Sequence, residues 1–116
     1  TRHVIDAAAL AKMKPTATLT NVARGGLVDE DALADALAGG RLAAAALDVF
    51  EGEPRVNPRL LALRNIVLSP HVGSASHATR RAMAALAVDN LVAALGHGPR
   101  AGDPPTPIAA KAAAKR

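Results

Sequence analysis

Apolar and polar residues follow one another along this chain in a pattern that predicts α-helices alternating with β-strands. Residues 5–13 have apolar positions at helical spacing, and Pro15 ends that helix. Residues 18–23 carry β-branched side chains at alternate positions and stop at a pair of glycines, which is typical of a buried strand. A second helix is expected to begin at Asp29, where acidic side chains suit the helix dipole, and to end at the next glycine pair.

The same alternation continues through the second half of the chain. Residues 43–50 predict a buried strand although their alanines favour a helix intrinsically, because the preceding helix has just stopped at glycines. Residues 57–63 predict a short helix with Pro58 in its first position, residues 66–69 a third strand, and residues 76–95 the longest helix. The expected fold class is therefore α/β, with a doubly wound parallel sheet and flanking helices on both faces.

Composition limits the classes of protein that fit this pattern. The 116 residues suffice for one domain at most, and alanine rather than aromatic residues supplies much of the apolar content. The absence of cysteine excludes disulfides and thiolate metal sites. The formal charge of +4 comes from scattered basic residues, so we expect no nucleic-acid partner. No apolar run approaches the roughly 20 residues that cross a bilayer, so we expect no membrane association and a cytoplasmic location.

Each predicted strand leads into a loop that carries a residue suited to acid–base chemistry or anion binding. Arg24 follows the first strand beside two glycines, Glu53 follows the second, and His71 follows the third within a Gly/Ser loop. The carboxyl ends of parallel strands meet at one edge of a sheet, where active sites form. A carboxylate can orient an imidazole and favour its protonated form, while a guanidinium can bind an anionic substrate and polarise its carbonyl. Together the three side chains suit the reversible reduction of a 2-oxo acid.

Each of these residues also has a simpler interpretation. Arg24 alone would be a surface arginine that caps a turn, and Glu53 alone a solvated carboxylate near Asp48 and Glu51. His71 is the strongest single candidate, because imidazole titrates near neutral pH. The remaining histidines are interpreted as structural or surface residues without metal-ligand spacing, so no metal site is expected: His3, His77 and His97.

Several stretches of the sequence resemble one protein family. The NAD-binding domain of the D-isomer-specific 2-hydroxyacid dehydrogenases, which include glyoxylate/hydroxypyruvate reductases and phosphoglycerate dehydrogenases, is similar over about residues 1–96. The resemblance implies a partial Rossmann-like fold, with residues 1–98 as the C-terminal part of a nucleotide-binding domain and residues 99–116 as a Pro/Ala/Lys-rich, extended or disordered tail. The stretches that carry it are Asn21-Val22-Ala23-Arg24-Gly25, Leu47-Asp48-Val49-Phe50, Glu53-Pro54 and Ser69-Pro70-His71-Val72-Gly73-Ser74.

The resemblance also implies a role for each site residue. Arg24 would bind the carboxylate and carbonyl of a small 2-oxo or 2-hydroxy acid, His71 would exchange a proton with the substrate oxygen, and Glu53 would support His71. NAD or NADP is the implied cofactor, and a homodimer is the implied assembly of the intact protein. The residues expected at the cofactor are Val22, Ala23, Arg24, Asp48, His71, Gly73 and Ser74.

The start of the sequence changes the expected activity of the chain. It begins at Thr1 rather than methionine, and no Gly-x-Gly-x-x-Gly phosphate loop is present. Because that loop supplies much of the cofactor affinity, we expect the C-terminal portion of a larger oxidoreductase that is inactive in isolation. The alternative that stays open is a non-enzymatic remnant or binding module that keeps the fold without the cofactor.

Overall fold

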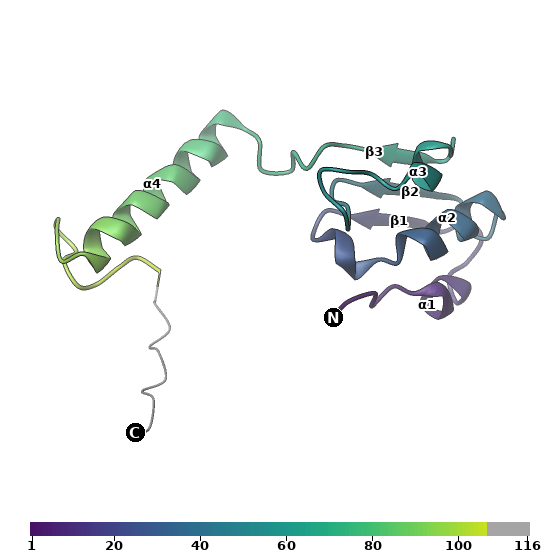
Figure 1. Ribbon diagram of the computed structural model, residues 1–116, viewed down its shortest axis with the longest axis horizontal. Helices are drawn as coiled ribbons and strands as arrows, with labels where there is room; N and C mark the ends of the chain where they lie inside the picture. The colour runs from purple at the N-terminus through teal and green to yellow at the C-terminus, as the bar shows by residue number, and fades with distance from the viewer. Residues whose placement is uncertain (107–116) are drawn as a thin grey trace, which may run out of the picture. The chain divides into compact units, whose positions relative to one another are not determined.

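The computed structural model describes residues 1–106 and forms two compact units, Thr1–Gly73 and a second that begins at Ser74 (Figure 1). The first unit contains a sheet with its helices, and the second contains one long helix. Residues 107–116, which are part of the predicted tail, lie outside the described residues.

Three parallel strands form the sheet of the first unit, in the order β1 (Thr18–Asn21), β2 (Ala44–Leu47) and β3 (Ile66–Leu68). The alanine-rich stretch is the central strand, as predicted, and it pairs in register with both neighbours. All three strands run in the same direction, so their carboxyl ends lie at one edge of the sheet.

The α-helices of the first unit begin at capping side chains. Asp6, Asp29 and Asn57 each accept a hydrogen bond from a backbone N–H of the following turn, which satisfies donors that lack a partner inside the helix. Pro58 occupies the first helical position, as predicted. The resulting helices are α1 (Ala7–Ala11), α2 (Glu30–Ala38) and α3 (Pro58–Leu61), and a 3₁₀ turn, η1 (Gly25–Leu27), lies between β1 and α2.

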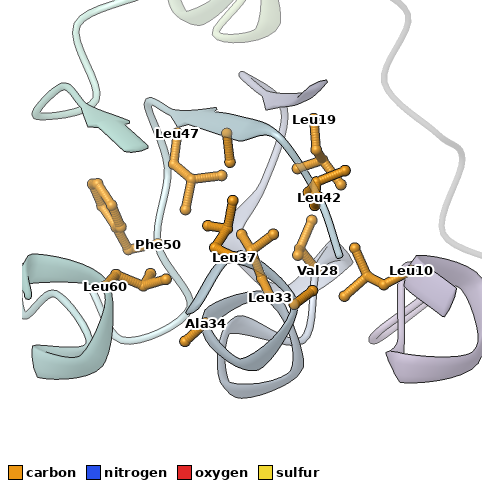
Figure 2. Close-up of a cluster of buried hydrophobic side chains, with 12 residues drawn as sticks. Leu10, Leu19, Val28, Leu33, Ala34, Leu37, Leu42, Leu47, Phe50 and Leu60 are labelled. Atoms are coloured by element: carbon orange, nitrogen blue, oxygen red, sulfur yellow. The ribbon is translucent and has the colours of Figure 1, made fainter. Parts of the chain in front are cut away.

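The core lies on one face of the sheet, between the strands and the helices (Figure 2). Alternate residues of β1 are buried, whereas Thr20 and, on β3, Val67 are exposed on the opposite face. Helices were expected on both faces, but in this unit they cover one. The strands lie side by side in the order of the sequence, so each connection steps to the next strand in the same direction. Right-handed connections that step in the same direction place α2 and α3 on the same side of the sheet. The larger buried side chains of the core include Leu10, Leu19, Val28, Leu33, Leu37, Leu42, Leu47, Phe50 and Leu60.

The second unit is built around α4 (His77–Ala94), the longest helix as predicted, and the side chain of Ser76 caps its start. Its apolar face is exposed along much of its length, including Met83 and Leu91. The chain beyond the helix turns back, and the Asn90 amide holds residue 106 through two hydrogen bonds, of 3.1 and 2.8 Å. Among the described residues, none of the helices has the length and apolar character needed to cross a membrane.

Candidate active site

The three residues singled out by the sequence follow the three strands at their carboxyl ends. Arg24 lies three residues beyond the end of β1, Glu53 in the turn after β2, and His71 in the loop after β3. Because the strands are parallel and adjacent, the chain brings these loops to the same edge of the sheet.

The imidazole of His71 and the carboxylate of Glu53 are directly paired. Nδ1 of His71 lies 2.8 Å from Oε2 of Glu53, and both side chains remain accessible to solvent. An ionised carboxylate only accepts hydrogen bonds, so Nδ1–H is the donor and Nε2 is left for another partner. The other carboxylate oxygen of Glu53 accepts the backbone N–H of Phe50 at 2.9 Å. Glu53 is therefore oriented by its own turn while it orients the imidazole.

These contacts favour the charged form of the carboxylate. The hydrogen bond from His71 holds the pKa of Glu53 below its ordinary value, the Phe50 N–H lowers it further, and the charges of His71 and Arg24 add to the effect. The charge of Arg24 is the smallest of these causes, and the one described hydrogen bond of its guanidinium is to the Ala23 carbonyl. The structure thus pairs His71 with Glu53 directly, and it places Arg24 on another loop at the same edge of the sheet.

The loop that carries His71 is fixed by Asp48. The buried carboxylate of Asp48 accepts the backbone N–H groups of Val72 at 2.9 Å and Gly73 at 2.8 Å, and it accepts the hydroxyl of Ser69 as well. The Ser69 hydroxyl is the main cause, and the Val72 N–H the next, of a lowered pKa for Asp48. His71 has a φ of 53°, in the left-handed region that non-glycine residues rarely adopt, so this loop needs such restraints.

Arg24 is presented by a loop that the buried Asn21 organises. The Asn21 amide donates to the carbonyl of Arg24 at 2.9 Å and accepts the backbone N–H of Ala23 at 3.1 Å. The guanidinium donates to the Ala23 carbonyl at 2.6 Å and is otherwise exposed. Val22, beside it, is 69% exposed.

An open cavity of about 420 Å³ lies against the paired residues. Its walls are mainly apolar, and the Glu53 and His71 side chains supply the polar groups. Such a mixture is typical of small-ligand sites. The lining residues are Phe50, Glu53, Pro54, Val56, Pro70 and His71.

The structure adds residues that the sequence interpretation missed. Ser69 was seen only as the end of a strand, but its hydroxyl binds Asp48. His3, interpreted as structural or surface, contacts the carboxylate of Glu51 at 2.9 Å. These contacts join residues 21 and 48 positions apart, so local spacing gives no signal for them.

Ser74, a predicted cofactor residue, is the first residue of the second unit. Within residues 1–106, the structure contains no group of three His, Cys, Asp or Glu side chains arranged to hold a metal.

Known proteins resemble the chain closely in sequence. Glyoxylate/hydroxypyruvate reductase B of Pectobacterium atrosepticum is 58% identical over 96 residues, which cover 82% of this chain and 30% of the relative. The same reductase of Erwinia tasmaniensis is 59% identical over 96 residues, which again cover 82% of this chain and 30% of the relative. The chain therefore spans about a third of the length of the relatives it matches.

Solved structures give the same result for the fold. An NADPH-dependent glyoxylate/hydroxypyruvate reductase of Sinorhizobium meliloti, crystallised with citrate, superposes with a TM-score of 0.78 at 47% identity, over 84% of this chain and 32% of that one. A protein of Thermus thermophilus superposes with a TM-score of 0.82 at 44% identity, over 93% of this chain and 33% of that one. The three-stranded sheet is thus part of a Rossmann-type fold.

The family model for the D-isomer specific 2-hydroxyacid dehydrogenase, NAD binding domain, matches residues 1–73. That segment is the whole of the first unit, and it contains Arg24, Glu53 and His71. The chain belongs to the D-isomer specific 2-hydroxyacid dehydrogenase family, of which it carries part of the NAD-binding domain.

Proposed function

We propose that this chain carries the acid–base half of the active site of an NAD(P)-dependent 2-hydroxyacid dehydrogenase, acting on a small 2-oxo or 2-hydroxy acid. The observation that supports this most directly is the 2.8 Å pair between His71 and Glu53, with the charge of Arg24 acting on it. Glyoxylate and hydroxypyruvate are the substrates proposed first, because the matching reductases are named for them.

Three side chains divide the work in this proposal. The guanidinium of Arg24 binds the substrate carboxylate and polarises the carbonyl at C2. His71, protonated and held through Nδ1, gives a proton from Nε2 to the carbonyl oxygen during reduction and takes it back during oxidation. Glu53 keeps the ring oriented and stabilises its positive charge. The chemistry that a bound nicotinamide cofactor supplies is hydride transfer to or from C2.

The residues present suit the nicotinamide end of NAD or NADP. The exposed Val22 and the Ala23 backbone lie at a strand end beside Arg24, where an apolar side chain can contact an aromatic ring. The backbone amides of Val72 and Gly73 are already used by Asp48, so Asp48 would act there chiefly by shaping the loop. The sequence contains no Gly-x-Gly-x-x-Gly loop to hold the pyrophosphate.

A hybrid enzyme tests this function. The 96-residue segment of this chain that aligns with the Pectobacterium atrosepticum reductase would replace the matching segment of that enzyme. We expect the hybrid to reduce glyoxylate or hydroxypyruvate, and His71→Ala to lower kcat about 1000-fold. His77→Ala, at an exposed histidine that begins α4, is the matched control and should leave kcat within about twofold. A hybrid whose turnover survives His71→Ala would refute the role of His71.

The second candidate is a binding module or remnant that keeps the fold without catalysis. The absence of the Gly-rich loop from these 116 residues favours it. Calorimetric titration of the chain with NADH separates the two candidates. Tight binding would exclude the remnant, whereas an inactive hybrid together with no NADH binding would support it.

The cytoplasmic location and the homodimer stay proposals for the protein in which the segment acts. The similarity to glyoxylate/hydroxypyruvate reductases supports the first. The second rests on the family resemblance alone, and sedimentation of the hybrid would test it.

A further inference from the structure

We propose that Glu51 is a positioning residue for the His71–Glu53 pair, held for that purpose by Arg2 and His3. The inference rests on the proposed function, because it concerns the geometry of the same site. It assigns a role to a cluster at the start of the chain that neither acid–base chemistry nor cofactor binding uses.

Both carboxylate oxygens of Glu51 have cationic or imidazole partners from residues 48 and 49 positions earlier. Nε of Arg2 donates to Oε1 at 2.8 Å, and its Nη2 lies 2.7 Å from the same oxygen. Nε2 of His3 lies 2.9 Å from Oε2. The side chain of Glu51 is therefore fixed at two points on a segment distant in sequence.

The backbone of Glu51 is fixed as well. Its N–H donates to Oε1 of Glu30 at 2.7 Å, and Glu30 is only 7% exposed. The preceding residue, Phe50, donates its N–H to Glu53 at 2.9 Å. The short turn that presents Glu53 is thus held by α2 on one side and by residues 2–3 on the other.

The same cluster reaches the loop of Arg24. The backbone N–H of His3 donates to the carbonyl of Gly26 at 2.8 Å, two residues beyond Arg24. The other ring nitrogen of His3 lies 3.7 Å from Oδ2 of Asp29, which caps α2. The charged and titratable groups around Glu51 are accordingly Arg2, His3, Asp29 and Glu30, and they connect the two loops that carry Arg24 and Glu53.

A simple surface ion pair would not explain this arrangement. The Arg2 side chain is 75% exposed, and pairs of that kind contribute little to stability. If the cluster served stability alone, its loss would change little beyond the unfolding temperature. If the cluster positions the turn that carries Glu53, its loss should change the surroundings of Glu53. Glu53 itself makes no described hydrogen bond to Arg2 or His3.

Two substitutions at Glu51 separate position from charge. Glu51→Asp keeps the charge but shortens the side chain, so it cannot reach both partners. Glu51→Gln removes the charge but keeps the length and an acceptor for Arg2. The readout is the pKa of Glu53, followed by carboxyl ¹³C NMR on the 116-residue chain without substrate or cofactor.

A positioning role predicts that Glu51→Asp raises the pKa of Glu53 by about half a unit or more, because the bonds from His71 and Phe50 loosen. Glu51→Gln should leave it nearly unchanged. A charge effect predicts the reverse: loss of the negative charge in Glu51→Gln lowers the pKa of Glu53, and Glu51→Asp leaves it as it was. That second pattern, or no change in either variant, would overturn the proposal.

Asp35→Ala is the matched control, because Asp35 is an exposed carboxylate of the same unit that pairs with Arg59. It should leave the pKa of Glu53 unchanged, and a shift as large as that of Glu51→Asp would contradict a specific role. In the hybrid enzyme, Glu51→Asp should lower kcat about tenfold while KM changes little. The Glu51→Gln variant should keep most of the original kcat. The titration needs no turnover, so an inactive hybrid would count against the proposed function and leave the positioning result intact.

Discussion

Gly25 packs directly against the peptide that joins Phe50 to Glu51. A Cβ at residue 25 would lie 1.9 Å from the carbonyl carbon of Phe50 and 2.3 Å from the nitrogen of Glu51. These are backbone atoms and cannot rotate away. The glycine after Arg24 therefore allows the loop that carries Arg24 to touch the turn that carries Glu53.

Gly25→Ala is expected to destabilise the first unit by about 3 kcal/mol, because one of the two loops must move. Gly26 is the matched control, since a Cβ there meets nothing within 4 Å. Gly26→Ala should change the free energy of unfolding by less than about 0.5 kcal/mol. Urea unfolding followed by far-UV circular dichroism compares the two variants. Equal stability would show that the loops do not touch in solution.

Asp48→Asn is expected to loosen the loop of His71. The amide group can no longer accept all three hydrogen bonds that the carboxylate accepts from Ser69, Val72 and Gly73. With the left-handed backbone of His71 released, kcat of the hybrid should fall about 100-fold. Ser69→Ala removes a single donor and should have a smaller effect. Steady-state kinetics measures both, and a larger loss in Ser69→Ala would contradict the order.

Acid should destabilise the first unit by protonating the carboxylates of Asp48 and Glu53. The folded-state pKa values of Asp48 and Glu53 lie below their ordinary values of 3.8 and 4.5, so the unfolded chain binds more protons in that range. The stability that these two carboxylates contribute is complete at a pH above their ordinary pKa values. It is lost as the pH falls through their folded-state pKa values. The urea midpoint should therefore drop between about pH 5 and pH 2. In Glu53→Gln that drop should be smaller, and an identical pH dependence would contradict the assignment.

Local sequence signals were sufficient for most elements of the fold. The helix that begins at Asp29, the position of Pro58 and the strand of alanines follow from short-range chemistry, and the structure confirms them. Which face of the sheet the helices cover could not be predicted in this way, because it depends on the order of the strands and the hand of their connections. The alternation of helices and strands along the sequence does not determine the order of the strands in the sheet.

The candidate site was predictable only in part, for a related reason. Strand ends point to Arg24, Glu53 and His71, since parallel strands share an edge. The groups that hold those residues come from elsewhere in the chain: the carboxylate of Asp48 reaches 24 and 25 positions along, and His3 reaches 48. Such contacts depend on the folded positions of whole loops, so no motif marks them.

Arg24→Ala in the hybrid should act mainly on substrate binding. The guanidinium is exposed, and its one described hydrogen bond is to the adjacent Ala23 carbonyl, so it remains available for a carboxylate. Loss of a charge-assisted contact predicts a rise in KM of about 100-fold, with a smaller fall in kcat from the unpolarised carbonyl. Arg24→Lys keeps the charge but not the planar fork, and should recover only part of the affinity. Because the Arg24 charge also lowers the pKa of Glu53, that pKa should rise in Arg24→Ala and stay low in Arg24→Lys. A KM unchanged by both variants would place the substrate carboxylate elsewhere.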